Sequence, residues 1–282
     1  MHTALLLLAL LLCLATLAPG VPLPPPRRET FNCTLDGSRW PYLVQDPPGP
    51  AQALLINLHG HYSDETQMMT EGIYEDAFGK LRRECLRRNW VYVCAWYGGN
   101  SWMGPLGEAG MVDLIGVLKQ RWPGVPVYLQ GGSMGGSSAL VFATRQPQLL
   151  AGVIAHCPAA DIAAYYDWAV ARGGANATLR NITDAIRLHY TMDGRDLRQE
   201  LEARSALRHA ERLTMPVQLC HGSADALIPV DWTRQLAAKL QALGRRVQYE
   251  EIAGGDHDAP VRGVDWARIL DFVSTSGSAP AP

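Results

Sequence analysis

Six short apolar runs, spaced along the chain, constrain its fold more than any other feature. Most of the runs are continuous rather than alternating, a pattern typical of parallel strands that are covered on both faces. The runs are residues 54–58, 90–95, 125–129, 152–156, 217–220 and 247–252. Longer segments with helical character lie between or after them, at residues 74–88, 108–121, 133–145, 232–243 and 266–273. This alternation predicts an α/β protein with a doubly wound, mostly parallel sheet.

A glycine-rich turn joins the third apolar run to the helical segment after it. Residues 131–136 read Gly-Gly-Ser-Met-Gly-Gly, which contains the Gly-x-Ser-x-Gly pattern of a nucleophile elbow. In such a turn the strained serine lifts its hydroxyl above the sheet edge, and small neighbours let strand and helix pass closely. The chain has 27 glycines, so the pattern alone is only moderately specific. Ser133 is the candidate nucleophile, and the backbone N–H of Met134 is a candidate oxyanion donor.

A serine nucleophile needs a base, and the base needs an acid that orients it. In hydrolases with this elbow, an acidic residue and then a histidine follow the serine along the chain. Asp225 lies in the loop after the fifth apolar run, and His257 lies in the loop after the sixth. Both loops follow the C-terminal ends of strands, where open α/β sheets place their sites. Order and placement together predict a triad of Ser133, Asp225 and His257.

These motifs resemble those of the α/β-hydrolases, specifically the prolyl-oligopeptidase-type and dienelactone-hydrolase-like branch. The likeness spans roughly residues 50–273, and it rests on residues 59–60 (His-Gly), 131–136, 205–210, 221–230 (His-Gly-Ser-Ala-Asp…Ile-Pro-Val) and 254–257. The resemblance implies an α/β-hydrolase fold and a serine hydrolase that forms an acyl-enzyme without a metal or an organic cofactor. It also implies that the backbone N–H of His61 or Tyr62 is the second oxyanion donor.

The resemblance departs from the peptidases of that branch in one respect. Those peptidases carry a large N-terminal propeller, and no segment of this sequence fits one. The predicted function is therefore a secreted serine hydrolase that cleaves carboxylic esters. Two alternatives stay open, namely a compact serine peptidase acting on short peptides and a catalytically silent binding module.

Several polar residues near the predicted triad have a structural interpretation as well. Asp231 is expected to cap the next helix, and Asp256 and Asp258 fit a polar surface loop. His221 and His156 fit buried structural histidines better than catalytic ones, although His156 is also a candidate for the pocket floor.

An aromatic segment, residues 96–102 (Trp-Tyr-Gly-Gly-Asn-Ser-Trp), follows the second apolar run. Trp96, Tyr97 and Trp102 are candidate substrate-binding residues, because such rings suit an aromatic acyl group or a sugar ring. Packing of the loop against the core explains them equally well.

Residues 158–212 interrupt the alternation of strands and helices. A connection this long is usually a cap or lid, and it follows a strand that ends on the same edge as Ser133. The segment is therefore predicted to be a helical cap insertion, with an ordinary surface insertion as the alternative.

The first 20 residues are predicted to be a cleavable signal peptide. An apolar run over residues 4–17 is too short for a comfortable membrane span, and Ala18-Pro19-Gly20 follows it. No Lys or Arg precedes the run, so an uncleaved signal anchor is the alternative. The mature protein is then expected to be secreted or extracytoplasmic. Its expected parts are a flexible leader and N-terminal strand region (21–48, with the leader over 21–30), the hydrolase domain (49–273) and a disordered tail (274–282).

Secretion bears on two further residue types. Asn32, Asn176 and Asn181 stand in Asn-x-Thr triplets and are glycosylation candidates, with chance as the alternative. The chain has six cysteines, of which Cys13 lies in the signal peptide, so the mature chain cannot pair all of its thiols. Free buried thiols are expected at positions 94, 157 and 220, and a bridge from position 33 to 85 or 94 stays open.

Composition limits the partners. The chain has 282 residues, is 48% hydrophobic and carries a formal net charge of −2, which suits one globular domain with a sizeable core. No basic cluster indicates nucleic-acid binding, and no Cys/His cluster has metal-ligand spacing. The expected partner is a small-molecule ester or a short peptide, with no stable membrane span after signal cleavage. The acyl group, the alcohol and the oligomeric state stay open.

Overall fold

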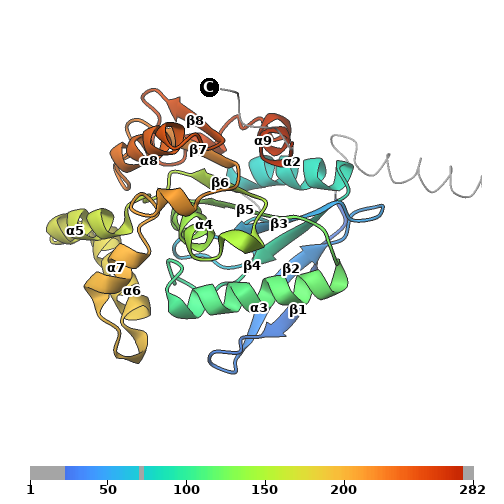
Figure 1. The fold of residues 1–282 in the computed structure, drawn as a ribbon, viewed down its shortest axis with the longest axis horizontal. Coiled ribbons are helices and arrows are strands. Elements are labelled where there is room, and N and C mark those ends of the chain that lie inside the picture. The colour runs from blue at the N-terminus through green and yellow to red at the C-terminus, as the bar shows by residue number, and fades with distance from the viewer. Residues whose placement is uncertain (1–22, 70–72, 276–282) are drawn as a thin grey trace, which may run out of the picture.

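The computed structural model describes residues 23–69 and 73–275. Its centre is an eight-stranded sheet in the order β1-β2-β4-β3-β5-β6-β7-β8, with helices on both faces (Figure 1). The strands are β1 (Arg27–Asn32), β2 (Arg39–Gln45), β3 (Ala53–Leu58), β4 (Trp90–Ala95), β5 (Val127–Gly132), β6 (Gly152–His156), β7 (Val217–Gly222) and β8 (Val247–Ile252). Strands β3 to β8 pair in parallel. The doubly wound, mostly parallel sheet predicted from the sequence is confirmed.

The strand order reverses beside β3. The chain passes from β3 to β4 on one side and then to β5 on the other side of β3. Open α/β sheets bind their ligands outside the carboxyl ends of the strands at such a reversal. Ser133 directly follows β5, and His59 directly follows β3, so both lie at this point.

An antiparallel hairpin extends the sheet at its N-terminal edge. β1 pairs with β2, and β2 pairs with β4, both in antiparallel register. The expected flexible leader over residues 21–30 is therefore wrong for residues 27–30, which belong to β1. Their backbone groups are paired to β2 residues 41–44, and this pairing orders the segment despite its polar side chains.

Two cores lie on the two faces of the sheet. Helices α3 (Pro105–Arg121), α4 (Met134–Arg145) and α8 (Asp231–Ala242) cover one face, and α2 (Ile73–Arg87) and α9 (Trp266–Ser274) cover the other (Figure 1). Strands β3 to β7 are almost wholly buried, which explains their largely apolar sequences. The edge strand β8 is partly exposed. Short 3-10 turns complete the fold at Pro147–Leu149, Met192–Gly194, Ala210–Arg212 and Ala259–Val261.

Residues 158–212 contain the helices α5 (Ile162–Gly173), α6 (Ala177–Tyr190) and α7 (Leu197–Ala203). Polar side chains begin all three, because Asp161, Asn176 and Asp196 each accept a backbone hydrogen bond as N-cap residues. The three helices lie together beside the sheet, to the left in Figure 1. The segment between β6 and β7 is thus helical, as the sequence predicts.

Three further expectations concern the two termini, the cysteines and a membrane span. The predicted signal peptide and residues 276–282 lie outside the described residues, and Ser274, expected in a disordered tail, is instead the last residue of α9. The described cysteines are all buried and free, so no bridge joins position 33 to 85 or 94; they are Cys33, Cys85, Cys94, Cys157 and Cys220. Within residues 23–69 and 73–275, no helix is long and apolar enough to cross a membrane.

Candidate active site

Ser133 occupies a strained turn between β5 and α4. Its backbone has φ 58° and ψ −122°, a conformation that L-residues rarely adopt. Its N–H donates to the carbonyl of His156 at 2.9 Å, which ties the turn to the end of β6. A Cβ atom on Gly135 would lie 2.1 Å from the Leu58 carbonyl oxygen, and one on Gly131 would lie 2.3 Å from the carbonyl carbon of Gly135. The glycines on both sides of Ser133 are therefore sterically required.

The structure brings the three predicted triad residues together. His257 Nε2 lies 2.8 Å from Ser133 Oγ, and His257 Nδ1 lies 2.7 Å from Asp225 Oδ2. The Asp225 carboxylate is an acceptor only, so Nδ1 carries the proton and Nε2 accepts from the serine hydroxyl. In this tautomer His257 can remove the proton of Ser133.

The carboxylate of Asp225 is held on both oxygens. Its side chain is fully buried, and Oδ1 accepts from the N–H groups of Leu227 at 2.8 Å and Ile228 at 2.9 Å. Oδ2 accepts from His257 and also from His221 Nε2 at 3.1 Å. These bonds fix the direction in which the acid faces His257.

His221 is a contact that sequence reasoning missed, because a structural role alone was favoured for it. Its Nε2 also lies 2.9 Å from the Ile228 carbonyl oxygen, so Nε2 is the protonated nitrogen and donates to both acceptors. Its Nδ1 lies 2.8 Å from Thr233 Oγ1. The available signal was the spacing, since His221 stands four residues before Asp225 at the same strand end.

The pKa values of Asp225 and His257 shift in opposite directions. Burial raises the pKa of Asp225, but hydrogen bonds from His221 and His257 and the charge of His257 lower it more, so it stays ionised. Burial lowers the pKa of His257, while the Cys157 thiol and Asp225 raise it, and the net shift is upward. A nearby carboxylate thus favours the imidazolium that forms when His257 accepts a proton.

The predicted oxyanion donors lie on the turns after β3 and β5. Met134 is the first residue of α4 and is fully buried beside Ser133. The N–H of Tyr62 already donates to Asn100 Oδ1 at 2.8 Å, which favours His61 over Tyr62 as the second donor. The His61 side chain receives a hydrogen bond from Trp102 Nε1 at 3.2 Å, so its Nε2 carries the proton that it donates to Asn181 Oδ1 at 2.8 Å. His61 thereby links this turn to helix α6.

In the aromatic segment after β4, the structure favours loop packing over a substrate platform for two of the three candidate residues, Tyr97 and Trp102. Tyr97 and Trp102 have no exposed surface, and Tyr97 donates its hydroxyl to the His59 carbonyl at 2.7 Å. Trp102 stacks on Tyr165 of α5, with ring centroids 5.6 Å apart. Packing therefore explains Tyr97 and Trp102. Trp96 is half-buried and packs edge-on against the core.

The structure also places the other polar residues that the sequence analysis considered near the triad. Asp231 is the first residue of α8 rather than its cap, and it accepts a hydrogen bond from Arg234. Asp256 is exposed and pairs with an arginine, and Asp258 accepts from a tyrosine hydroxyl. His156 is buried and stacks on Trp266 at 5.5 Å between centroids, which supports a structural role.

Two of the three glycosylation candidates are exposed. Asn32 ends β1 and Asn181 lies on α6, and both are exposed. Asn176 is half-buried because its side chain caps α6.

One group of described side chains has the donor types and proximity to hold a metal ion. It comprises Cys157, Asp225 and His257, which offer one sulfur, one oxygen and one nitrogen ligand. Two of its members belong to the predicted triad.

Comparison with protein-family models identifies the family of this chain. The model of the prolyl oligopeptidase family matches residues 126–276, which is more than half of the 282 residues and includes Ser133, Asp225 and His257. Comparison with curated protein sequences gives no match.

Solved structures show the same fold at low identity. An acylaminoacyl peptidase from Pyrococcus horikoshii has a TM-score of 0.62 and 17% identity over 88% of this chain. Est1E from Butyrivibrio proteoclasticus has a TM-score of 0.59 and 16% identity over 87% of this chain and 95% of its own. An S-formylglutathione hydrolase from Agrobacterium tumefaciens has a TM-score of 0.65 and 14% identity, over 87% and 92% respectively. This chain spans 40% of the length of the peptidase. From the family match, the chain belongs to the prolyl oligopeptidase family, and its sheet and helices form the α/β-hydrolase fold.

Proposed function

We propose that this protein is a secreted serine hydrolase that cleaves carboxylic ester bonds with Ser133, His257 and Asp225. The observation that carries the proposal is the hydrogen-bonded series from Ser133 Oγ to His257 Nε2 at 2.8 Å and from His257 Nδ1 to Asp225 Oδ2 at 2.7 Å. A nucleophile within hydrogen-bond reach of a base that a third group orients is the arrangement required for acyl transfer.

The first half of the reaction forms an acyl-enzyme. Ser133 Oγ attacks the acyl carbon while His257 Nε2 takes the hydroxyl proton, and the charge of Asp225 stabilises the resulting imidazolium. The carbonyl oxygen becomes negative and is held by the backbone N–H groups of Met134 and His61, because the N–H of Tyr62 already donates to Asn100. The tetrahedral intermediate then collapses, and the alcohol leaves with the proton from His257.

The second half releases the acid. Water attacks the acyl carbon on Ser133, and His257 Nε2 takes one of its protons. Collapse of this second intermediate returns the proton to Ser133 Oγ and frees the carboxylic acid. Apart from water, every group that acts in these steps is a side chain or a backbone N–H of this chain.

The ester assignment draws support from the length of the matched segment. The match covers 95% of Est1E and 92% of the S-formylglutathione hydrolase, against 40% of the acylaminoacyl peptidase. Proteins with this fold and about this extent therefore include a hydrolase of S-formylglutathione. A peptidase acting on short peptides is the second candidate, because the family is named for a peptidase and several of the similar solved structures are peptidases.

Two measurements test the reaction. The folded protein should hydrolyse p-nitrophenyl acetate and should react covalently with a fluorophosphonate probe at Ser133. Ser133→Ala should lose both properties, whereas Ser274→Ala, which lies at the end of α9, should keep them. Hydrolysis that survives in Ser133→Ala would refute the nucleophile, and failure of the folded protein to react with the probe would favour a binding module.

Substrate choice separates the candidates. Short-chain esters and dipeptide amides should be assayed side by side, and faster turnover of the amides would favour the peptidase. A series of p-nitrophenyl esters of increasing chain length, extended to feruloyl and acetylated sugar esters, would define the acyl group.

Secretion rests on the apolar segment near the N-terminus. Expression in a secreting host should release protein that begins after Ala18 or Gly20, as read by N-terminal sequencing. A mass decrease after removal of N-linked glycans would show which of Asn32, Asn176 and Asn181 is modified.

A further inference from the structure

Cys157 is a buried thiol beside the proposed triad that the reaction does not use. It follows β6 directly and is 3% exposed. Its φ is +39°, a conformation that is strained for a residue with a Cβ atom. Its N–H donates to the Cys220 carbonyl at 2.8 Å, which holds the residue at the strand end.

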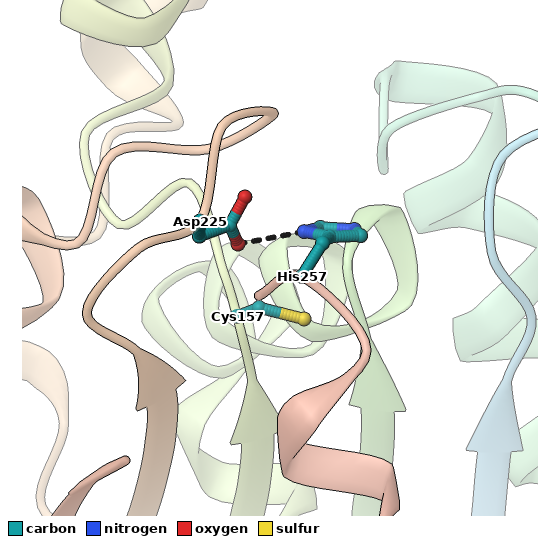
Figure 2. A group of neighbouring side chains, drawn as sticks. All are labelled: Cys157, Asp225 and His257. Atoms are coloured by element: carbon teal, nitrogen blue, oxygen red, sulfur yellow. Dashed lines mark hydrogen bonds and ion pairs between the residues drawn. The ribbon is translucent and has the colours of Figure 1, made fainter. Parts of the chain in front are cut away.

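The Cys157 sulfur completes a group of three different ligand atoms. Cys157 Sγ, a carboxylate oxygen of Asp225 and a ring nitrogen of His257 all lie within 4.8 Å of one another. Figure 2 shows the thiol directed into the space beneath the His257 ring, while Asp225 faces the ring nitrogen from the side. The group is drawn from the ends of β6 and β7 and from the loop after β8.

We propose that Cys157, Asp225 and His257 form a binding site for a thiophilic divalent cation, Zn²⁺ being the physiological example, and that occupation of this site switches the hydrolase off. The site itself follows from the three side chains, and the inhibition rests on the function proposed above.

The donor set matches the preferences of zinc. Zn²⁺ binds cysteine sulfur, histidine nitrogen and carboxylate oxygen, and three protein ligands leave a fourth position for water. Tetrahedral coordination places such ligand atoms roughly 3.4–3.6 Å apart, as follows from zinc–ligand distances of about 2.0–2.3 Å. The pair His257 Nδ1 and Asp225 Oδ2, now 2.7 Å apart, must therefore open slightly, and the thiol must draw in.

Charge balance favours the bound state. The cation replaces the proton of the Cys157 thiol, and that proton is released to solvent. A thiolate, a carboxylate and a neutral imidazole together neutralise a divalent cation, so the buried complex carries no net charge. The His257 side chain is 17% exposed, which leaves a route from solvent to the site.

Coordination removes the general base by fixing a tautomer. A neutral imidazole whose Nδ1 binds a cation must carry its proton on Nε2. His257 Nε2 would then donate to Ser133 rather than accept from it. The serine can no longer lose its proton to His257, and Asp225 no longer orients the ring.

Cadmium titration tests the site independently of catalysis, because Cd²⁺ bound to thiolate gives an ultraviolet charge-transfer band. The full protein should show this band at one Cd²⁺ per chain. Cys157→Ala and His257→Ala should each abolish it. Cys220→Ala, a matched change of a buried cysteine on the neighbouring strand, should keep it. Cys157→Ser, whose hydroxyl is a poor ligand for the ion, repeats the test should Cys157→Ala fail to fold.

Zinc inhibition of ester hydrolysis then tests the switch. Zn²⁺ should inhibit the wild type reversibly, with activity restored by EDTA. Loss of an outer-shell partner alone costs about 10–100-fold in metal affinity, so loss of the thiolate should raise the inhibitory Zn²⁺ concentration by at least about 100-fold. Cys220→Ala should respond as the wild type does.

Three results would overturn the proposal: no Cd²⁺ band in the wild type, a band that survives in Cys157→Ala, or equal inhibition by Zn²⁺ of wild type and Cys157→Ala. A different result would reject only the proposed function. In that case the Cd²⁺ band would be lost in both Cys157→Ala and His257→Ala, which supports the metal site, but the wild-type protein would hydrolyse no ester.

Discussion

Replacing Arg204 by methionine should loosen the helical segment of residues 158–212 from the sheet. Arg204 follows α7, and its side chain is only 2% exposed. Its Nη1 donates to the Met103 carbonyl at 2.8 Å and to Glu108 Oε2 at 2.7 Å, while its Nε donates to Glu200 Oε2 at 3.0 Å. Methionine fills a similar volume without a charge or a donor, so the change isolates these bonds.

The expected loss in the free energy of unfolding depends on which hydrogen bonds the partners of Arg204 keep in the variant. Breaking a buried ion pair by removing one partner costs about 3–5 kcal/mol. Glu108 keeps a hydrogen bond from Gln146 at 2.8 Å and an ion pair with Arg145 at 3.3 Å, which places the loss near the lower end. A loss of about 3 kcal/mol corresponds to a fall in Tm of roughly 6–12 °C for a domain of this size.

Thermal unfolding monitored by circular dichroism measures the effect. Arg208→Met is the matched control, because Arg208 is 39% exposed and its ion pairs are expected to contribute about 0–1 kcal/mol. Equal Tm values for the two variants would refute the argument that a buried Arg204 docks the helices.

The pH dependence of the same difference gives a second check. Burial raises the pKa of Glu108, but the charges of Arg204 and Arg145 and a hydrogen bond from Gln146 also act, and the net shift is downward from 4.5. A depressed pKa in the folded state contributes stability above pH 4.5 that is lost as the pH falls through the folded value. The stability difference between wild type and Arg204→Met should therefore be full at neutral pH and shrink in acid. A difference that grew in acid would contradict the assignment.

Three further substitutions probe the site. Asp225→Asn should lower kcat about 10⁴-fold with a retained fold, because the histidine loses its correct tautomer; an equal loss in Asp231→Asn, on the surface, would contradict this. Gly135→Ala should prevent folding or remove activity, since its Cβ would lie 2.1 Å from a carbonyl oxygen, whereas Gly116→Ala, with no atom within 4 Å, should leave expression and activity unchanged. His221→Leu should lower kcat roughly 10–150-fold at constant KM, as a hydrogen bond to a charged group contributes about 1.5–3 kcal/mol; His221→Gln, which keeps a donor, should restore most of it, and no rescue would indicate a purely structural role.

The central strands could be predicted because burial on both faces leaves a local signature. Runs of apolar residues mark β3, β4, β6 and β7 whatever their neighbours are. The edge strand β8 is only partly buried, and its sequence contains Gln248, Glu250 and Glu251. For β5 the expected run of 125–129 shifts to Val127–Gly132. Pro126 has no N–H for the ladder, and Gly131 and Gly132 still pair with β3 and β6 although they have no side chain to mark them.

The N-terminal hairpin could not be predicted in the same way. β1 is an edge strand in which Phe31 alone is buried, and its other side chains are polar or partly exposed. Charged edge strands blunt unwanted pairing, but their composition is that of a flexible leader. The pairing to β2 that orders them is a property of the sheet rather than of the local sequence.

In the candidate site, too, local sequence patterns predicted some features, and contacts between distant segments determined the others. The elbow, the acid and the histidine follow a fixed order at strand ends, which the sequence displays. The burial of Tyr97 and Trp102 depends instead on distant segments, such as Tyr165 of α5 stacking on Trp102. The contact of His221 with Asp225 likewise depends on how the loop after β7 folds back, and spacing only suggests it.

The hydrogen-bond ladder of the sheet continues past the strand ends into the site. The backbone N–H of Ser133 donates to the His156 carbonyl. The backbone N–H groups of Cys157 and Ser223 donate in the same way to the carbonyls of Cys220 and Ile252. Groups held in this way open only when the sheet itself opens, so their local unfolding free energy should approach that of the whole domain. The nucleophile is thus fixed in place before any ligand arrives, and little of the energy of binding has to be spent on reorganising the groups that react.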